Sequence, residues 1–353
     1  MKNYHINITS IQQSRLGDID FSKLTFGMEM ADHMFVAEYE NGEWKNLSIA
    51  PYANLSLSPA TAALHYGQAI FEGMKAYRST DGGINLFRPR ENWERFNRSA
   101  MRMCMPEVPE EIFIGGISQL VDLDRNWIPE REGSSLYIRP FMFSTDPNLG
   151  VRPSQKYTFV IFTSPVSTYF SKPPRVKIET DFIRAAAGGV GAAKCAGNYG
   201  GSLYPAKLAH EQGYDQLIWT DAKTHTFIEE SGAMNVMFMI DGILLTPKVS
   251  DTTLDGITRK SILSIAGHWG IPVEERKISV QEVVSALSQN RLQAAFGAGT
   301  AAVVSPFAAI GYEGNDYEIQ PGANDSFVVR IKQYLTDLYT GKTPDVFGWN
   351  YKI

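Results

Sequence analysis

Residues 185–204 read AAAGGVGAAKCAGNYGGSLY, a run of glycines and alanines around a single lysine, Lys194. Such a run is typical of phosphate-binding loops, but it fits neither common nucleotide motif. The P-loop pattern G-x-x-x-x-G-K-[ST] fails because the lysine lies between Ala193 and Cys195. The dinucleotide pattern G-x-G-x-x-G fails because its last glycine position is occupied by Lys194 itself. The segment therefore does not predict a nucleotide site.

A lysine that does chemistry is the second interpretation. An ordinary lysine has a pKa of about 10.4, so it is protonated and a poor nucleophile. Burial or a neighbouring cation favours the free amine. The small residues around Lys194 leave room for a flat ring beside its side chain, and the phenol of Tyr199 can donate to a ring oxygen. The local sequence fits a surface lysine in a flexible glycine loop equally well, so the decision rests on the rest of the chain.

The bulk composition narrows the class of protein. The chain has 353 residues, enough for two domains, with 44% hydrophobic and 20% charged residues, as in a globular protein. A net charge of −5 argues against a nucleic-acid partner. Two cysteines provide no disulfide framework or zinc-finger spacing, and the N-terminal residues lack the apolar segment of a secretory signal, so we expect a cytoplasmic protein.

One uncharged stretch, residues 294–311, resembles a membrane segment only superficially. It consists largely of Ala, Gly, Ser and Thr, and Pro306 interrupts it. A membrane-spanning helix needs about 20 strongly apolar residues. The stretch predicts strand, loop and strand, and no membrane partner is expected.

Turn and helix signals predict a mixed α/β architecture. Hairpin turns are expected at Asn41-Gly42, Asp81-Gly82-Gly83 and Asp241-Gly242, so antiparallel sheet should be prominent in both halves. Apolar periodicity predicts helices over 91–105, 110–127, 257–269 with a stop at Gly270, 279–287 with a capping box from Ser279 to Glu282, and 326–341. Pro173-Pro174 marks the domain boundary, giving a small domain 1–166, a linker 167–178 and a large domain 179–353.

The whole chain resembles a known family. The segment GGVGAAKCAGNYG resembles the cofactor-lysine segment of fold type IV pyridoxal-phosphate enzymes, and most closely that of the branched-chain amino-acid aminotransferases. The same family's blocks follow in the same order at LTFGMEMADHMFVAEY, LHYGQAIFEGMKAY, SLYIRPFMF, FIEESGAMN and AFGAGTAAVVSP. The resemblance implies two α/β domains with largely antiparallel sheets, pyridoxal 5′-phosphate between them, and a homodimer in which Tyr66, Leu149 and Val151 reach the partner's pocket.

The resemblance also implies a set of cofactor-binding residues. Lys194 would bind the cofactor covalently and then act as the acid–base group. Glu230 would lie beside the pyridine nitrogen, whereas Glu229 falls on the opposite face of the strand. Arg95 would bind the phosphate, with Arg98 and Arg102 as alternatives on the same helix. The remaining expected contacts are Ile257 and Thr258 at a helix start, Thr300, and Tyr199 on the ring oxygen.

The resemblance also implies a set of substrate-binding residues. The pocket for the substrate side chain would be lined by Phe26, Tyr66, Tyr137 and Tyr169. The α-carboxylate would meet the backbone N–H groups of Thr300 and Ala301, and Arg139 would recognise the distal carboxylate of glutamate. The implied reaction converts leucine, isoleucine and valine, with 2-oxoglutarate, to the 2-oxo acids and glutamate.

The sequence departs from the family pattern in two places. Ala302 and Ser305 replace a C-x-x-C of mammalian members, so no thiol switch is expected there, and Ala233 replaces a threonine found in some members.

Two alternative functions stay open. The nearer one is another fold type IV enzyme, a D-amino-acid aminotransferase or aminodeoxychorismate lyase. The rival from another class is a non-catalytic pyridoxal-phosphate-binding dimer, which would have no need of Arg139.

Overall fold

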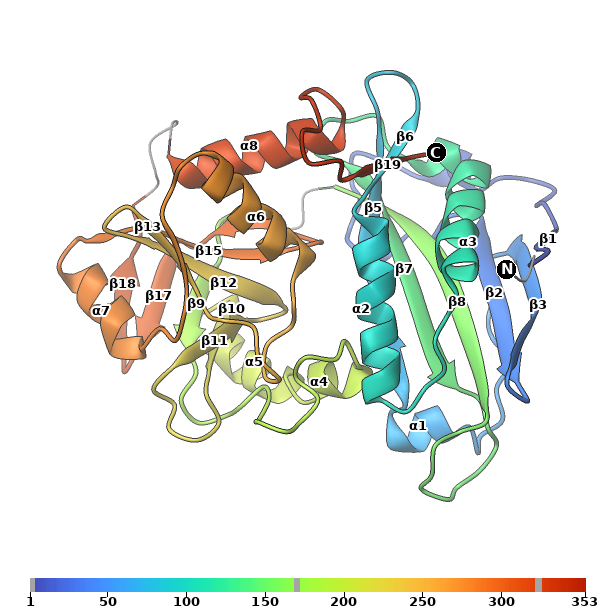
Figure 1. Ribbon diagram of the computed structural model, residues 1–353, viewed down its shortest axis with the longest axis horizontal. Helices are drawn as coiled ribbons and strands as arrows, with labels where there is room; N and C mark the ends of the chain where they lie inside the picture. Colours follow the sequence, from blue (N-terminus) through green and yellow to red (C-terminus); the bar gives the residue numbers. More distant parts are fainter. Residues whose placement is uncertain (1–3, 168–171, 321–325) are drawn as a thin grey trace. The chain divides into compact units, whose positions relative to one another are not determined.

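The computed structural model describes residues 4–167, 172–320 and 326–353 (Figure 1). By its contacts the chain divides into two compact units. The first comprises Met1–Tyr169, Ala193–Ala196 and Thr336–Ile353, and the second comprises Phe170–Ala192 and Gly197–Leu335. The predicted boundaries 1–166 and 179–353 stay a prediction. The division by contacts differs from the predicted boundaries because it assigns residues 193–196, which include Lys194, and residues 336–353 to the first unit.

The first unit is built on one sheet with strand order β1-β3-β2-β8-β7-β5-β6-β19, and β4 pairs with β7. All of its strand pairs are antiparallel except β1 with β3. The strands are β1 (Asn7–Ile8), β2 (His33–Glu40), β3 (Glu43–Pro51), β4 (Ala69–Phe71), β5 (Met74–Arg78), β6 (Ile84–Phe87), β7 (Ser135–Ser144), β8 (Lys156–Val166) and β19 (Asn350–Lys352). The helices are η1 (Leu16–Asp18), α1 (Ala62–Tyr66), α2 (Pro89–Arg102), α3 (Glu110–Leu123) and η2 (Arg125–Trp127).

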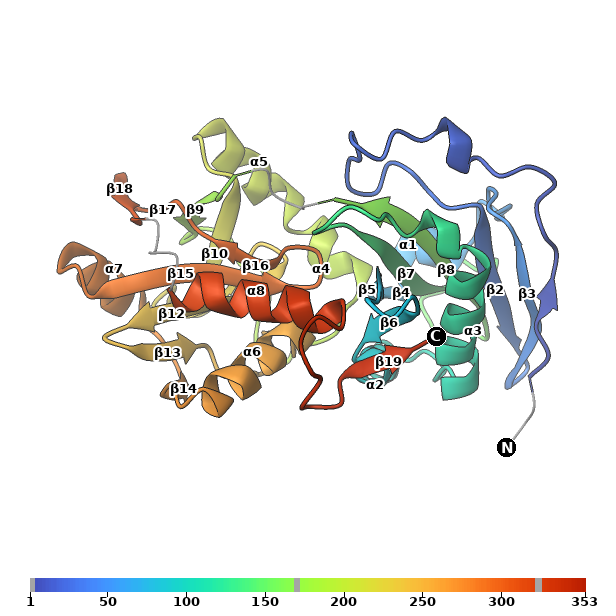
Figure 2. The same cartoon turned by 90° about the horizontal axis from the view of Figure 1, so that it is seen from above.

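Helices α2 and α3 cover one face of this sheet, and the segment before β2 crosses the other face (Figure 2). The helix face is packed with aromatic rings, among them Phe96, Phe113 and Phe159, whose centroids lie 5.3 to 5.7 Å apart. Side chains alternate along β7, so Tyr137 and Arg139 project from the face opposite to the helices. The unit therefore has one apolar core face and one face that carries polar chemistry.

The second unit has the strand order β14-β13-β12-β11-β10-β9-β17-β18, with β15 pairing β12 and β16. Its strands are β9 (Arg175–Ile178), β10 (Gln216–Thr220), β11 (Ile228–Ser231), β12 (Met234–Ile240), β13 (Ile243–Thr246), β14 (Val273–Glu275), β15 (Leu292–Gly299), β16 (Val303–Pro306), β17 (Ala309–Tyr312) and β18 (Asn315–Glu318). Its helices are α4 (Ala196–Gly200), α5 (Leu203–Glu211), α6 (Ile257–His268) and α7 (Val280–Ser288), while α8 (Phe327–Tyr339) runs across the division.

The core of the second unit lies on both sides of β10. Ile218 packs with α7 and the long strand β12, whereas its neighbours Leu217 and Trp219 pack against Ala209 of α5. Alternation along the strand therefore places α5 and α7 on opposite faces. Residues 175–178, which the sequence assigned to the linker, form the inner strand β9, because their alternate residues Val176 and Ile178 are apolar and buried.

Several local predictions are confirmed. Asn41 and Gly42 turn between β2 and β3 with φ values of 54° and 83°, as the type I′ hairpin requires. Ser279 accepts the N–H of Glu282 at 3.0 Å and caps α7. Gly270 follows α6 with a φ of 71°. Residues 294–311 form strands and turns, and among the described residues no helix meets the length and hydropathy needed to span a membrane.

Candidate active site

Lys194 is held in the first unit by its own backbone. Its N–H donates to Oγ of Ser99 at 2.9 Å, and its carbonyl accepts the N–H of Phe71 at 3.0 Å. The next residue, Cys195, forms a β-bridge with Ile70. The amine lies 4.7 Å from the ring centroid of Phe71. The lysine is thus half-buried and fixed between α2 and β4, which argues against the surface-loop interpretation.

The nearest buried ion pair joins Arg95 to Glu72. Nε and Nη2 of Arg95 donate to the two carboxylate oxygens at 2.7 and 2.9 Å, and Asn92 and the N–H of Gly73 donate to the same group at 2.8 and 3.1 Å. Burial would raise the pKa of Glu72, but the charges of Arg95 and Lys194 and these hydrogen bonds outweigh it and hold the pKa below its usual value. The carboxylate is therefore ionised inside the protein.

One face of α2 supplies these contacts. Asn92, Arg95 and Ser99 are spaced three and four residues apart, so they share that face, and all three are buried. Arg98 and Arg102, the alternatives on the same helix, are exposed. The structure therefore brings Arg95, and neither alternative, into the cluster with Lys194.

The polar face of the first sheet gathers several expected substrate residues. Arg139 donates to the Tyr137 hydroxyl at 3.1 Å and lies 4.8 Å from the Phe71 ring, while Phe26 packs edge-on against Tyr137 with centroids 5.0 Å apart. Nε of Arg139 is buried and has no hydrogen-bond partner, and among the described residues no carboxylate pairs with it. The Nε–H donor of this guanidinium is therefore left unsatisfied by the described protein groups.

Lys75 was missed by sequence reasoning although it lies in the FEGMKAY block. It is the register partner of Tyr137 across β5 and β7, so both side chains leave the same face of the sheet. Burial lowers the pKa of Lys75 to about 8. The same face therefore carries a second basic group near Arg139.

Glu230 is the buried carboxylate of the second unit. It accepts Nε of Arg184 at 2.9 Å, Nδ2 of Asn235 at 3.0 Å and the N–H of Leu254 at 2.7 Å. Three donors, one of them charged, favour the ionised form. Glu229, one residue earlier in the strand, accepts instead from the hydroxyl of Thr252 at 2.6 Å.

The N-terminus of α6 is tied to the same carboxylate. Leu254 and Asn235 both contact Glu230, and an added Cβ on the N-cap residue Gly256 would lie 1.8 Å from Oδ1 of Asn235. Ile257 and Thr258 follow as the first two residues of the helix and are buried. The free N–H groups at this end suit an anion.

Thr300 and Ala301 form the turn between β15 and β16 and are half-buried. Ala298 of β15 is the register partner of Asn235, and Gly299 packs on Met234, so the turn lies at the same end of the sheet as Glu230. The structure thus gathers Glu230, Thr258 and Thr300 at one end of the second unit.

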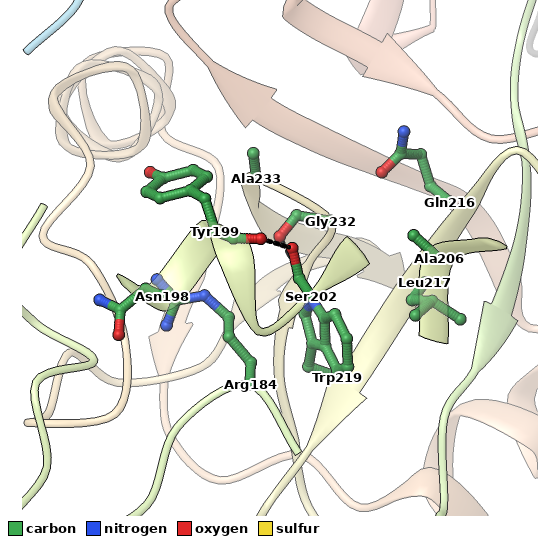
Figure 3. A pocket seen from close by; sticks show the side chains of 10 residues that line it. All are labelled: Arg184, Asn198, Tyr199, Ser202, Ala206, Gln216, Leu217, Trp219, Gly232 and Ala233. Carbon is green, nitrogen blue, oxygen red and sulfur yellow. Dashed lines mark hydrogen bonds between the residues drawn. The ribbon is translucent and has the colours of Figure 1, made fainter. Parts of the chain in front are cut away.

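Tyr199 lines a pocket of about 110 Å³ in the second unit (Figure 3). The walls come from α4, α5, β10 and the β11–β12 turn, and they consist of Arg184, Asn198, Tyr199, Ser202, Ala206, Gln216, Leu217, Trp219, Gly232 and Ala233. Arg184 lines this pocket and also pairs with Glu230 at 2.9 Å.

The glycine-rich segment has a packing role in this unit. An added Cβ on Gly191 would lie 2.7 Å from Cα of Thr252, and Asp251 accepts the N–H groups of Gly188 and Ala192. Gly191 therefore lets two backbones approach closely.

One expected residue, Tyr66, lies apart from these clusters. The hydroxyl of Tyr66 donates to the carbonyl of Leu149, and the ring is 44% exposed. Tyr169 lies outside the described residues. The neighbours of the expected residues that sequence reasoning missed are Glu72, Asn92, Lys75, Arg184 and Asn235. The sequence did offer one indication of these residues. A charged residue in an apolar run, such as Glu72 in AIFEGM, must be exposed to water or paired inside the protein.

The residues fit pyridoxal phosphate by their chemistry. The first unit offers an amine with a buried guanidinium on a neighbouring element, and the second offers an ionised buried carboxylate, a phenol and helix N–H donors. These are the groups needed for an aldehyde, a phosphate and a ring nitrogen. Among residues 4–167, 172–320 and 326–353, no cluster of three or more His, Cys, Asp or Glu side chains could hold a metal ion.

Comparison with known proteins gives consistent matches. The family model described as amino-transferase class IV matches residues 69–310. Branched-chain-amino-acid transaminase 1 of Bacillus subtilis is 44% identical over 339 residues, covering 95% of each chain. The crystal structure of the Escherichia coli branched-chain amino acid aminotransferase superposes with a TM-score of 0.75 at 28% identity, covering 90% of this chain and 98% of that one. The branched-chain aminotransferase of the thermophilic archaeon Thermoproteus uzoniensis, solved with norvaline, gives a TM-score of 0.75 at 26% identity, covering 91% and 99%.

Proposed function

The chain belongs to the class IV aminotransferases and, within them, to the branched-chain-amino-acid aminotransferases, and from that premise we propose that it transfers the amino group of L-leucine, L-isoleucine and L-valine to 2-oxoglutarate with pyridoxal 5′-phosphate. The observation that carries this proposal is the placement of Lys194 between α2 and β4, in one cluster with the buried Arg95. A lysine anchored through its backbone presents its amine from a fixed point, as a reacting group requires.

Four residue groups would hold the cofactor, which supplies an electron sink for the bonds at the substrate α-carbon. Lys194 would bind its aldehyde and Arg95 its phosphate. Ile257 and Thr258 would offer helix N–H groups, and Thr300 a hydroxyl, to the same phosphate. Tyr199 would donate to the ring oxygen. Glu230, which accepts from three donors, would favour a proton at the ring nitrogen.

Lys194 would have a second role with the cofactor bound. Its Nζ would accept the proton from the substrate α-carbon and donate a proton to the cofactor carbon that bears the amino group. The ring of Phe71 beneath the amine excludes water from that side. Because the amino group would be held on the cofactor between the two half-reactions, the amino donor and acceptor would bind in turn.

The substrate face must accept an apolar side chain and a carboxylate in the same place. Phe26, Tyr137, Tyr66 and Tyr169 would provide the apolar walls, and Ala301 with Thr300 would bind the α-carboxylate. Arg139 lies against aromatic rings yet keeps a buried Nε without a partner. The distal carboxylate of glutamate would pair with the Arg139 guanidinium. With leucine bound, the guanidinium would keep its contacts with the rings of Phe71 and Tyr137.

A homodimer is part of the proposal. Leu149 and Val151 are 61% and 84% exposed, and Tyr66 lies beside Leu149, so this loop offers apolar surface to a second copy. The two cysteines are free thiols, which supports a reducing cytoplasmic location.

The test is an assay of the purified protein with pyridoxal phosphate, L-leucine and 2-oxoglutarate. We expect glutamate to form and the cofactor absorbance to change on adding L-leucine, and neither to occur in Lys194→Ala. Turnover of D-alanine without L-leucine would favour the D-amino-acid rival. An absorbance spectrum that never changes with any amino acid would favour the non-catalytic carrier.

A further inference from the structure

Glu72 occupies an unusual position for a carboxylate. It lies between the end of β4 and the start of β5, inside an otherwise apolar run, and its side chain is 0% exposed. A buried charge is retained only when its partners compensate for the lost water. The four donors to Glu72 come from three places, namely Arg95 and Asn92 on α2 and the N–H of Gly73.

The geometry of the Arg95 contact fixes an orientation. Two parallel hydrogen bonds, one from Nε and one from Nη2, set both the rotamer and the plane of the guanidinium. Asn92 holds the carboxylate from the other side and also donates to the carbonyl of Gly73. Arg95 is therefore aimed by Glu72 before any ligand arrives.

Glu72 is connected to Lys194 as well. Phe71, its chain neighbour, donates to the carbonyl of Lys194, and the ring of Phe71 lies under the amine. The charge of Lys194 is also one of the causes that keep Glu72 ionised. One carboxylate is thereby coupled to the amine and to the guanidinium of the same cluster.

We propose that Glu72 is a positioning residue that aims Arg95 at the phosphate of pyridoxal phosphate. This inference rests on the proposed function, which assigns the phosphate to Arg95. Glu72 itself does not touch the ligand, because it is fully buried and both of its oxygens accept protein donors.

The experiment compares two ligands that differ only in the phosphate. Protein freed of cofactor is titrated with pyridoxal phosphate and separately with pyridoxal, and Kd is measured by absorbance for the wild type and Glu72→Gln. We expect the Kd of pyridoxal phosphate to rise about 10- to 100-fold in the variant, because Arg95 loses its charge-assisted pair. The Kd of pyridoxal should change less than about threefold, since that ligand makes no use of Arg95.

Three controls separate positioning from folding. Glu94→Gln, the same substitution on the exposed side of α2, should leave both Kd values unchanged. Asn92→Leu removes one donor to Glu72 without removing the charge, and should give the same selective loss at a smaller size of about two- to fivefold. Thermal unfolding without ligand reports whether each variant is folded, and Asn92→Leu carries the test if Glu72→Gln is not.

Each outcome has a meaning. If Glu72→Gln raises the Kd of both ligands by the same factor, Glu72 has a structural role alone and the inference is overturned. An unchanged Kd of pyridoxal phosphate also overturns it. Tighter binding of pyridoxal phosphate by Glu72→Gln also overturns it, because the carboxylate would then only repel the phosphate. A wild type that does not bind pyridoxal phosphate overturns the proposed function together with the inference.

Discussion

The two units each bury one glutamate–arginine pair, and the pairs are built alike. Glu72 accepts from Arg95, from Asn92 and from the N–H of Gly73, and Glu230 accepts from Arg184, Asn235 and the N–H of Leu254. In both, an arginine, an asparagine and a backbone amide compensate for the burial of a carboxylate.

The difference lies in which member of the pair is proposed to meet the ligand. In the first unit it is the arginine, and Glu72 aims it. In the second unit it is the carboxylate, and Arg184 holds it. The comparison teaches that two ion pairs of the same build can prepare a cation for a ligand in one unit and an anion in the other.

The largest effect that tests this difference is expected for Glu230→Gln. A glutamine cannot keep a proton on the ring nitrogen, so kcat should fall about 10²- to 10³-fold, while the cofactor still binds. The measurement is steady-state kinetics with L-leucine and 2-oxoglutarate. Glu229→Gln is the matched control, because Glu229 contacts Thr252, and it should keep kcat within about twofold. A fall in the control with none in Glu230→Gln would exchange the two assignments.

Arg139 extends the comparison to a guanidinium whose carboxylate is to come from the substrate. Arg139→Gln should raise KM for 2-oxoglutarate about 10- to 100-fold, because a charge-assisted pair is lost. KM for L-leucine should change less than about threefold. The two values are measured in the same two-substrate assay. Parallel changes for both substrates would show that Arg139 only supports the fold of the pocket.

Gly256 tests how tightly the second pair is enclosed. In Gly256→Ala the new Cβ would meet Oδ1 of Asn235 at 1.8 Å, so we expect a loss of about 1–3 kcal/mol in the free energy of unfolding. The matched control is Gly267→Ala in the same helix, where nothing lies within 4 Å. It should raise stability by about 0.5–1 kcal/mol, because alanine favours a helix. Urea unfolding measures the free energy of unfolding of both variants. Equal changes in the two variants would mean that Asn235 moves aside at little cost when Gly256 gains a Cβ.

The smallest effect concerns Glu229 and pH. Burial, with the nearby charges of Glu230 and Asp221, raises the pKa of Glu229 to about 7 from an ordinary 4.5, despite the Thr252 hydrogen bond. Between these two values the folded protein retains a proton that the unfolded chain has released, so the free energy of unfolding falls as pH rises. The side chain is only partly buried, so the discounted effect is about 1 kcal/mol.

In Glu229→Gln, the free energy of unfolding should therefore depend less on pH between about 4.5 and 7. We expect the variant to be more stable than the wild type at pH 8 by roughly that 1 kcal/mol, and about equal at pH 4.5. Urea unfolding at both pH values checks it. A variant that loses stability at pH 8 would mean that the ionised carboxylate is compensated by its neighbours.

The local predictions succeeded where short-range rules apply. Asn41-Gly42 adopts positive φ because glycine and asparagine tolerate it, and Ser279 caps its helix because its oxygen reaches the N–H three residues on. Strand alternation separated Glu229 from Glu230 correctly, and the structure gives them different partners. The linker boundary 167–178 stays a prediction, but Val176 and Ile178 within it form a strand through pairing with β10 and β17, which are distant in sequence.

The sequence by itself determined the family, the hairpins and the main helices, and it singled out Lys194 as a hypothesis, because motif order and local propensity are written along the chain. Only the tertiary structure decided what surrounds that lysine. Glu72 meets Arg95 across 23 residues, and Arg184 meets Glu230 across a longer separation. A charged residue does not reveal its partner in sequence, since the pairing follows from the packing of α2 on β4 and of the glycine-rich segment on its neighbouring turn. Gly191 is explained in the same way, by its close approach to Thr252.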